Sequence, residues 1–389
     1  MPDPVIQLLK DLIAIDSVNP SLVPGAAGEG QMADAVAERM RRMGLDVHVQ
    51  DAAPGRPNVV GVLEGRAPGR SMMFCGHLDT VGVEGMAAPF EPIERDGRIF
   101  GRGSQDMKSG VAAMIDAARV VKARGFTHGR LIVAAVADEE YASLGADALV
   151  REWTADAAVV TEPTDLQVGV GHRGFAWLEI ETRGRAAHGS RPREGRDAIL
   201  RMGRVLQRLE DLDRELQARP AHPVMGTASL HASTIEGGRE WSVYPDACRL
   251  RLERRTVAGE SAGTAAREID RLLEELGRLD PEFDASFRSV FGRPPYEIQT
   301  GHPLTAHIQD AAAAHGFAPA AVGMSFWTDA AVLAGAGIPS LVFGPRGAGL
   351  HSVEEYVESK SVIACRDVLA HLAERWCASA SNSPLPKVD

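Results

Sequence analysis

Side chains that bind metals or transfer protons are concentrated in five short segments of this sequence. The segments are GHLDT (76–80), GRGSQDMK (101–108), DEE (138–140), TEP (161–163) and HSVEE (351–355). Four of the five follow an apolar run typical of a strand or open a predicted helix. Because ligands of open α/β sheets bind at the carboxyl ends of strands, we expect these distant segments to meet there.

For two of the segments, an explanation without any metal is also available. His77 and Asp79 are two residues apart, so their side chains point the same way on an extended chain. The carboxylate could then fix the tautomer of a metal-bound imidazole. The alternative is that His77 and Asp79 belong to an ordinary polar turn after a strand and bind no metal. Asp106 lies in a glycine-rich loop before a predicted helix, where the helix dipole favours a carboxylate without any metal.

The acidic pair Glu139–Glu140 is more informative, because two adjacent carboxylates at a buried strand end need a cation or a shared proton. Glu162 ends the next apolar run, and His351 follows a glycine-rich stretch; solvated turns are the alternative for all four residues. Taken together, the segments supply two histidines and several carboxylates but no thiolate. This set suits zinc, manganese or cobalt, and the number of carboxylates indicates two metal ions.

The elements that must position these residues follow from hydrophobic periodicity. Up to residue 160, helical and strand-like patterns alternate, which predicts an α/β sheet with helices on both faces. The expected helices are 5–15, 31–43 and 108–124, and the expected strands are 45–50, 58–64, 71–75, 131–137 and 157–160.

The pattern changes near Gly171, where an inserted α+β domain is expected. Its predicted strands are 175–182, 227–235, 248–257 and 284–290, and its helices are 197–217 and 260–279. A helix at 304–315 and a strand at 340–343 then return to the first sheet. The expected division is 1–173 for the first part of the catalytic domain, 174–290 for the insert and 291–389 for the second part.

Composition excludes several classes of function. The 389 residues include 42 Lys and Arg against 53 Asp and Glu, a net charge of −11, which argues against nucleic acid and anionic membrane partners. No apolar run approaches the roughly 20 residues of a membrane span, and the amino terminus reads as an amphipathic helix rather than a signal peptide. With four scattered cysteines, we expect a cytoplasmic protein with reduced thiols. Segment 378–389 is expected to be disordered.

In its motifs the sequence resembles the family of co-catalytic zinc hydrolases that includes aminoacylase, acetylornithine deacetylase, succinyl-diaminopimelate desuccinylase and glutamate carboxypeptidase. The resemblance rests on the order GHLDTV, GRGSQDMKSG, DEE, TEP, GRAAHGS and HSVEEYV, and it covers almost the whole chain. It implies a zinc-peptidase-like sheet flanked by helices, with an inserted α+β lid that usually forms a homodimer.

The resemblance also implies roles for the residues above. One zinc ion would be held by His77, Asp106 and Glu162, and a second by Asp106, Glu140 and His351. Asp79 would orient His77. Glu139 would act as the general base that takes a proton from the attacking water and passes it to the leaving amine.

Five further residues are expected to contact the substrate. His188, in GRAAHGS, would reach the partner subunit's site and steady the oxyanion; a surface histidine is the alternative. Arg255 would hold a substrate carboxylate, with a solvated strand arginine as the alternative. Ser242 stands where the family often has asparagine, and Phe326-Trp327 precede Thr328 where many relatives have small residues, so we expect a bulkier apolar wall there.

The expected function is hydrolysis of the amide of an N-acyl-L-amino acid, as in acetylornithine deacetylase. A dipeptidase or glutamate carboxypeptidase-like metallopeptidase would share every catalytic residue and is the first alternative. A non-catalytic metal-binding protein on the same fold is the second, and the loss of Glu139 or a metal ligand would have favoured it.

Overall fold

The computed structural model describes residues 3–261 and 263–379. It divides into two compact units. The first comprises Met1–Val170, Ile298–Val322 and Thr328–Asp389, and the second comprises Gly171–Glu297 and Gly323–Trp327. The insert expected at 174–290 falls within the second unit.

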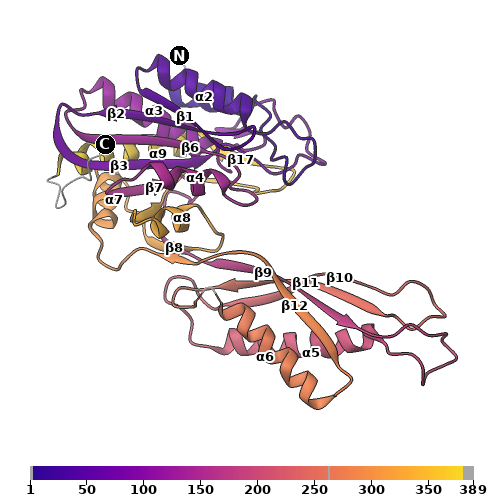
Figure 1. Cartoon of the computed structure of the whole chain (residues 1–389). Helices are drawn as coiled ribbons and strands as arrows, with labels where there is room; N and C mark the ends of the chain where they lie inside the picture. Colours follow the sequence, from indigo (N-terminus) through magenta and orange to yellow (C-terminus); the bar gives the residue numbers. More distant parts are fainter. Residues whose placement is uncertain (1–2, 262, 380–389) are drawn as a thin grey trace. The chain divides into compact units, whose positions relative to one another are not determined.

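The first unit is built on a mixed sheet with helices on both faces (Figure 1). The strand order is β1-β2-β6-β3-β7-β15-β8-β13, and β14 also pairs with β8. At the end of this order, β13, residues 171–172 of β8 and residues 323–324 of β14 are counted with the second unit. The bounds are β1 Asp46–Ala53, β2 Arg56–Glu64, β3 Ala67–His77, β6 His128–Val136, β7 Ala157–Val160, β8 Val168–His172, β13 Tyr296–Glu297, β14 Ala321–Met324 and β15 Ser340–Val342. The expected α/β fold class is confirmed.

Alternate residues of one strand show how the two faces are covered. A side chain at Gly61 of β2 would meet Met40 on helix α2, whereas Asn58 of the same strand donates to the carbonyl of Gly145 on helix α4. Asn58 and Gly61 are an odd number of residues apart, so they lie on opposite faces of the sheet and face different helices. The helices of this unit are α1 Pro4–Ile13, α2 Gly30–Arg42, α3 Lys108–Ala123, α4 Leu144–Glu152, α7 Pro303–Ala314, α8 Ala330–Gly335 and α9 Ser359–Ala378.

The centre of the sheet positions three of the chemical segments. β6, β3 and β7 are parallel neighbours, with His77 paired to Val136 and Cys75 paired to Val160. Residues 72–75 of β3, 131–136 of β6 and 157–160 of β7 are buried and apolar, as expected for strands covered on both faces. Because the three strands run in one direction, His77, the Glu139–Glu140 turn and Glu162 emerge at the same edge.

A small second sheet in the same unit positions the other two segments. Its order is β16-β17-β5-β4, with bounds β4 Ile93–Arg95, β5 Arg98–Phe100, β16 Gly347–Ala348 and β17 Tyr356–Glu358. Asp106 follows β5, and His351 lies between β16 and β17. Since β17 pairs with β5, the loops that carry these two residues lie side by side.

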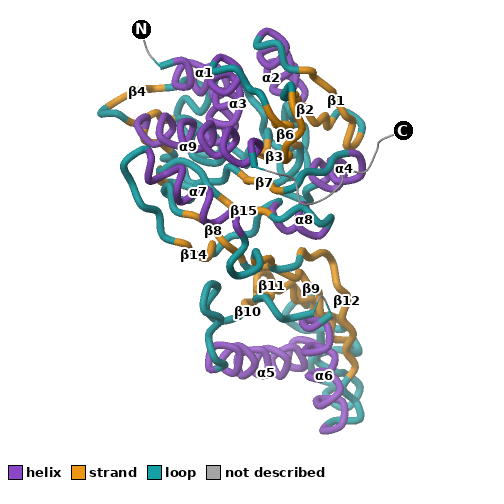
Figure 2. Tube along the Cα trace, turned by 90° about the vertical axis from the view of Figure 1, so that its left-hand side faces the viewer, coloured by secondary structure: helices purple, strands orange, loops and turns teal. Residues whose placement is uncertain are grey.

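The second unit is an antiparallel sheet covered on one face by two helices (Figure 2). The strand order is β10-β11-β9-β12. The bounds are β9 Gly174–Arg183, β10 Ser229–Gly237, β11 Ala247–Thr256, β12 Asp284–Arg293, α5 Ala198–Ala218 and α6 Thr264–Leu279. Leu178, Ile180, Leu250 and Leu252 point from β9 and β11 into the core beneath these helices.

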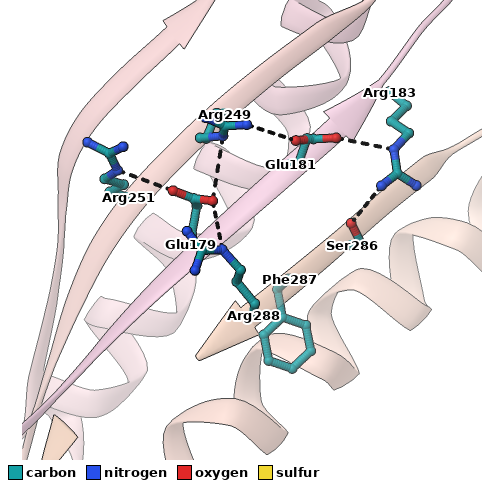
Figure 3. Close-up of a pocket in the computed structure, with 8 residues that line it drawn as sticks. All are labelled: Glu179, Glu181, Arg183, Arg249, Arg251, Ser286, Phe287 and Arg288. Atoms are coloured by element: carbon teal, nitrogen blue, oxygen red, sulfur yellow. Dashed lines mark hydrogen bonds and ion pairs between the residues drawn. The ribbon is translucent and has the colours of Figure 1, made fainter. Parts of the chain in front are cut away.

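The opposite face of this sheet is charged (Figure 3). Glu179 lies 3.0 Å from Nε of Arg288, 3.2 Å from Nε of Arg251 and 3.5 Å from Nε of Arg249. Glu181 continues the row, 3.2 Å from Nε of Arg183. The alternation of apolar and charged residues along β9 confirms the half-exposed strand predicted at 175–182.

Several elements were not predicted from the sequence, above all helix α9 and the small sheet. α9 runs to Ala378, the first residue of the tail that was expected to be disordered; residues 380–389 of that tail lie outside the described residues. Among the described helices, none combines the length and apolar character required to cross a bilayer.

Candidate metal centre

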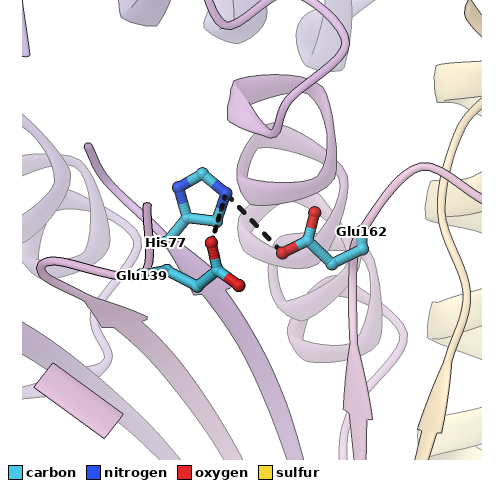
Figure 4. A group of neighbouring side chains, drawn as sticks. All are labelled: His77, Glu139 and Glu162. Atoms are coloured by element: carbon cyan, nitrogen blue, oxygen red, sulfur yellow. Dashed lines mark ion pairs between the residues drawn. The ribbon is translucent and has the colours of Figure 1, made fainter. Parts of the chain in front are cut away.

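His77, the last residue of β3, is the centre of the cluster. Its side chain is 1% exposed, and Nδ1 lies 2.9 Å from the backbone carbonyl oxygen of Asp79. Nε2 faces three carboxylates: it lies 3.1 Å from Asp106, 3.6 Å from Glu162 and 3.9 Å from Glu139. Figure 4 shows Glu139 and Glu162 approaching the same ring nitrogen from two different strand ends.

Asp106 lies between the two histidines. Its Oδ1 atom is 3.1 Å from Nε2 of His77, and its Oδ2 atom is 3.2 Å from Nε2 of His351. His351 also lies 3.1 Å from Oε2 of Glu140. The structure therefore brings together all five residues predicted as metal ligands, with one carboxylate shared between a His77 side and a His351 side.

The electrostatics of this cluster are those of a crowded acidic site. Burial, reinforced by the neighbouring carboxylates, raises the pKa of Glu139 and Glu162 well above the usual range and that of Glu140 to about 7. Burial alone would lower the pKa of His77, but the charges of Glu162 and the other carboxylates outweigh it and raise that pKa. Hydrogen bonds to Asp106 and Glu140 raise the pKa of His351 to about 10.

These residues fit divalent metal ions. The ligand atoms of His77, Glu139 and Glu162 lie within 4.8 Å of one another, as do those of His77, Asp106 and Glu140. In addition, Oε1 of Glu140 is buried with no hydrogen-bond partner among the described residues. Several buried carboxylates can be ionised together only when positive charge compensates them, and imidazole nitrogens with carboxylate oxygens suit zinc-like ions.

Asp79 holds the acidic pair in place. Its carboxylate accepts the backbone N–H of Glu139 and of Glu140, each at 3.1 Å. The carboxylate itself is 3.6 Å from Nδ1 of His77, so the imidazole hydrogen-bonds to the Asp79 carbonyl instead. One residue thus orients His77 through its backbone and the acidic turn through its side chain.

The sequence did not predict a buried network of hydrogen bonds and ion pairs that contacts Asp79. Asn19 donates to Asp79 at 2.7 Å and to Asp138 at 3.1 Å. Arg56 pairs with both oxygens of Glu29 and donates to Asp138 at 2.8 Å. Asp138 stands within the DEE segment but was given no role, and no spacing in the sequence relates it to Asn19 or Arg56.

Two residues predicted as substrate contacts lie together in the second unit. His188 is exposed, and its Nδ1 lies 2.8 Å from the hydroxyl of Ser190. It forms a bridge with Val243, and the N–H of Gly189 donates to the carbonyl of Ser242 at 2.7 Å. The GRAAHGS segment and the Ser242 segment are therefore neighbours.

Arg255 already has an anionic partner. Its Nε donates to Glu253 at 2.6 Å, and its guanidinium lies 5.6 Å from the ring centroid of Phe175. Phe175 also contacts Trp327, whose indole N–H donates to the carbonyl of Pro294 at 3.1 Å. Trp327 and Phe175 therefore belong to one aromatic cluster in the second unit, and the apolar wall of a substrate pocket stays a prediction.

Thr328 has a structural contact in the first unit. It is fully buried, and its hydroxyl accepts the N–H of Ala330 at 3.2 Å, at the start of α8. Thr328 therefore lies in the turn before α8, directly before the N-cap residue Asp329.

Comparison with known proteins agrees with the motifs. Residues 73–375 match the model of the peptidase family M20/M25/M40. An acetylornithine deacetylase of Myxococcus xanthus is 31% identical over 382 residues, which cover 95% of this chain and 96% of that protein. An N-formyl-4-amino-5-aminomethyl-2-methylpyrimidine deformylase of Bacillus subtilis is 29% identical over 410 residues, covering 96% and 95%.

Solved structures share the fold. A tripeptidase from Staphylococcus aureus superposes with a TM-score of 0.80 at 19% identity, covering 97% of this chain and 98% of that one. A dinuclear metal-binding peptidase of the M20 family from Bacillus subtilis gives 0.74 at 17% identity, covering 96% and 97%. With the family model matching most of its length, the chain belongs to the peptidase family M20/M25/M40 and is a metal-binding hydrolase of amide bonds.

Proposed function

We propose that this protein is a dinuclear metal amidohydrolase that releases the free amino acid from an N-acyl-L-amino acid. The observation that carries the proposal is the position of Asp106 between His77 and His351, with Glu140 and Glu162 completing the two sides. The choice of an acyl-amino acid is supported by the acetylornithine deacetylase relative at 31% identity.

The residues divide into two ligand sets around the shared carboxylate. His77, Asp106 and Glu162 would hold one ion, and Asp106, Glu140 and His351 would hold the other. Zinc suits this set best, and cobalt or manganese would also fit. When bound, two such ions would polarise the scissile carbonyl and lower the pKa of an attacking water.

Glu139 is the general base of the proposed mechanism. Its carboxylate is buried at the same sheet edge, and Asp79 fixes its backbone through the N–H contact. Burial raises its pKa, and positive charge at the ligand sites would lower that pKa again. Glu139 then accepts the proton of the attacking water and donates it to the leaving amine, which is too basic to depart unprotonated.

The second unit would supply substrate contacts. We assign His188 to the oxyanion, Arg255 to the substrate's carboxylate, and Ser242 and Trp327 to further substrate contacts. Because Arg255 pairs with Glu253, a substrate carboxylate would have to compete with that contact. A homodimer in which His188 serves the partner's site is part of this proposal, as is a cytoplasmic location; the four free, buried cysteines are compatible with a reducing compartment.

A deformylase is the second candidate, because a deformylase relative matches at 29% identity over almost the whole chain. Dipeptides are the third substrate class, since dipeptidases would use the same ligands and base.

One substrate panel tests the proposal. Metal-free protein is reconstituted with zinc, cobalt or manganese and assayed with N-acetyl-L-ornithine, N-formyl-amino compounds and dipeptides, with Glu139→Gln as the inactive control. The proposal expects the highest kcat/KM on an N-acyl-L-amino acid and loss of activity on chelation. Preference for dipeptides would replace the deacylase assignment, and full activity in metal-free protein would overturn the metal mechanism.

A further inference from the structure

We propose that Glu355 is a positioning residue of the metal centre, which sets the affinity of the ion on the His351 side. Glu355 lies four residues after His351, at the end of the hairpin loop that carries this histidine. The inference rests on the proposed function, because it concerns how that function's two ligand sets are held together.

The Glu355 carboxylate is enclosed by the loop that carries Asp106. One oxygen accepts the backbone N–H of Gln105 at 2.8 Å and of Asp106 at 3.0 Å. The other accepts the N–H of Gly103 at 3.0 Å and the guanidinium of Arg102 at 2.6 Å. Four donors from one loop thus converge on a side chain from another loop, and one of them is the peptide N–H of the shared ligand itself.

Arg102 extends this connection to a third segment. Its guanidinium also donates to the carbonyl of Ser352 and to that of Gly82, each at 3.1 Å. The side chains of Arg102 and Glu355 are 3% and 1% exposed. A buried, multiply hydrogen-bonded ion pair of this kind is rigid, because separating it would leave a charge unpaired away from water.

The loop around His351 has little other buried support. Residues 350–354 are all exposed, and the side chain of His351 is 53% exposed. Glu355 is the first buried residue after this run. The pairing of β17 with β5 brings the two loops together, and the Glu355 side chain is the buried contact that then fixes the distance between Asp106 and His351, whereas His77 and Glu162 are held by the strands β3 and β7.

This difference predicts a selective effect on the two ions. Changing Glu355 to Gln keeps the size of the side chain but leaves one acceptor oxygen for four donors. The Asp106 loop and the His351 loop would then move relative to each other, and the ion on the His351 side would bind more weakly. Supporting contacts of metal ligands typically change affinity about 10–100-fold.

The test is a metal titration of metal-free full-length protein with Zn²⁺, followed by calorimetry, and with Co²⁺, followed by its visible absorption. The matched control is Glu354→Gln, an exposed neighbour in the same loop. We expect two equivalents in the wild type and in the control. In Glu355→Gln we expect one of the two equivalents, assigned to the His351 side, to lose affinity about 10–100-fold. Glu355→Asp, which keeps the charge but shortens the side chain, should show a smaller loss of the same equivalent.

The outcomes separate this inference from the proposed function. If the wild type binds two ions and both Glu355 variants titrate like it, or lose both equivalents equally, the role of Glu355 is wrong and the metal mechanism stands. If the wild type itself binds no divalent ion, the proposed function fails. Should Glu355→Gln not fold, as judged by circular dichroism of the metal-free protein, the Glu355→Asp titration decides.

Discussion

The side-chain amide of Asn19 donates to the carboxylate of Asp79 across 2.7 Å, and both residues are fully buried. Asp79 in turn accepts the N–H groups of Glu139 and Glu140. Buried carboxylates need such donors to remain ionised. The loop after α1 is therefore linked through Asp79 to the proposed general base.

Replacing Asn19 by Ala should lower both stability and activity. Asp79 and Asp138 would each lose a buried donor, at a cost of about 1–3 kcal/mol in the free energy of unfolding. The acidic turn would also loosen, which lowers kcat. The control is Thr182→Ala, because Thr182 is equally buried but donates to the carbonyl of Ala198 in the second unit. Thermal unfolding and steady-state kinetics check this: Thr182→Ala should lose stability alone, and equal kcat in the two variants would contradict the link.

The acidic pair should separate catalysis from metal binding. Glu139→Gln is expected to keep both ions and to lower kcat at least about 10²-fold, the usual contribution of a general base. Glu140→Gln is expected to lose the ion on the His351 side, because Oε2 of Glu140 faces Nε2 of His351 at 3.1 Å. Elemental analysis together with kcat distinguishes the two, and exchanged phenotypes would reverse the assignment.

A third prediction concerns the packing of α3 against the sheet edge. A Cβ at Gly110 would lie 2.0 Å from the carbonyl oxygen of Thr161, next to Glu162. Gly110→Ala must therefore push α3 away from β7, which should cost about 1–3 kcal/mol or more by overpacking and weaken zinc binding. Gly277→Ala in α6 is the control. No atom lies within 4 Å of its added methyl, so its melting temperature should stay equal or rise slightly.

The metal-free protein should show a pH-dependent stability that traces to Glu140. Burial raises its folded-state pKa from 4.5 to about 7, so the folded state binds more protons than the unfolded state between these values. Stability from this group is then present at low pH and is lost as pH rises to about 7. Glu140→Gln imitates the protonated form and does not titrate.

The measurement is the difference in unfolding free energy between metal-free Glu140→Gln and metal-free wild type. Titrating groups that do not contact Glu140, including buried His172, are common to both proteins and largely cancel. His351 does not cancel, because Glu140 raises its pKa, and its loss of this partner reduces the difference. From pH 5 to pH 8 the variant should therefore gain at most roughly 2–3 kcal/mol over the wild type. A difference that shrinks with rising pH would show that the carboxylate is not protonated in the folded protein.

The sequence was sufficient to predict the part of the site that lies at the ends of strands with clear apolar runs. β3, β6 and β7 are recognisable as buried strands, and their parallel alignment brings His77, Glu139 and Glu162 together at one edge. The meeting of Asp106 and His351 could not be derived in this way. It depends on β5 and β16, which are three and two residues long, too short for any periodicity to be detected.

Helix α9 and the Asn19 network escaped prediction for different reasons. α9 packs against α3, α7 and β3, so it is buried on several sides and lacks one clear apolar stripe. The network joins Asn19, Arg56 and Asp138, which are brought together only by tertiary structure. Polar residues scattered along a sequence do not indicate that they will share a buried site.

The last prediction concerns His188 and the subunit arrangement. His188 belongs to the second unit, whereas all five candidate metal ligands belong to the first. We expect His188 of one subunit to donate to the oxyanion in the partner's site, where loss of one donor typically costs about 10²–10³ in kcat. The test is co-expression of two inactive variants, Glu139→Gln and His188→Ala, with His231→Ala, an exposed histidine of β10, as an active control.

In a mixed dimer, the chain with intact Glu139 would use the intact His188 of its partner, which rebuilds one of the two sites. Random pairing makes about half of the dimers mixed, so about a quarter of wild-type activity should return in a two-fold symmetric dimer. If His188 acts within its own chain, no site in the mixture is complete, and activity stays at the level of the single variants. That result, or full activity in a monomer, would remove the trans assignment of His188 while leaving the roles of Glu139 and the metal ligands unaffected.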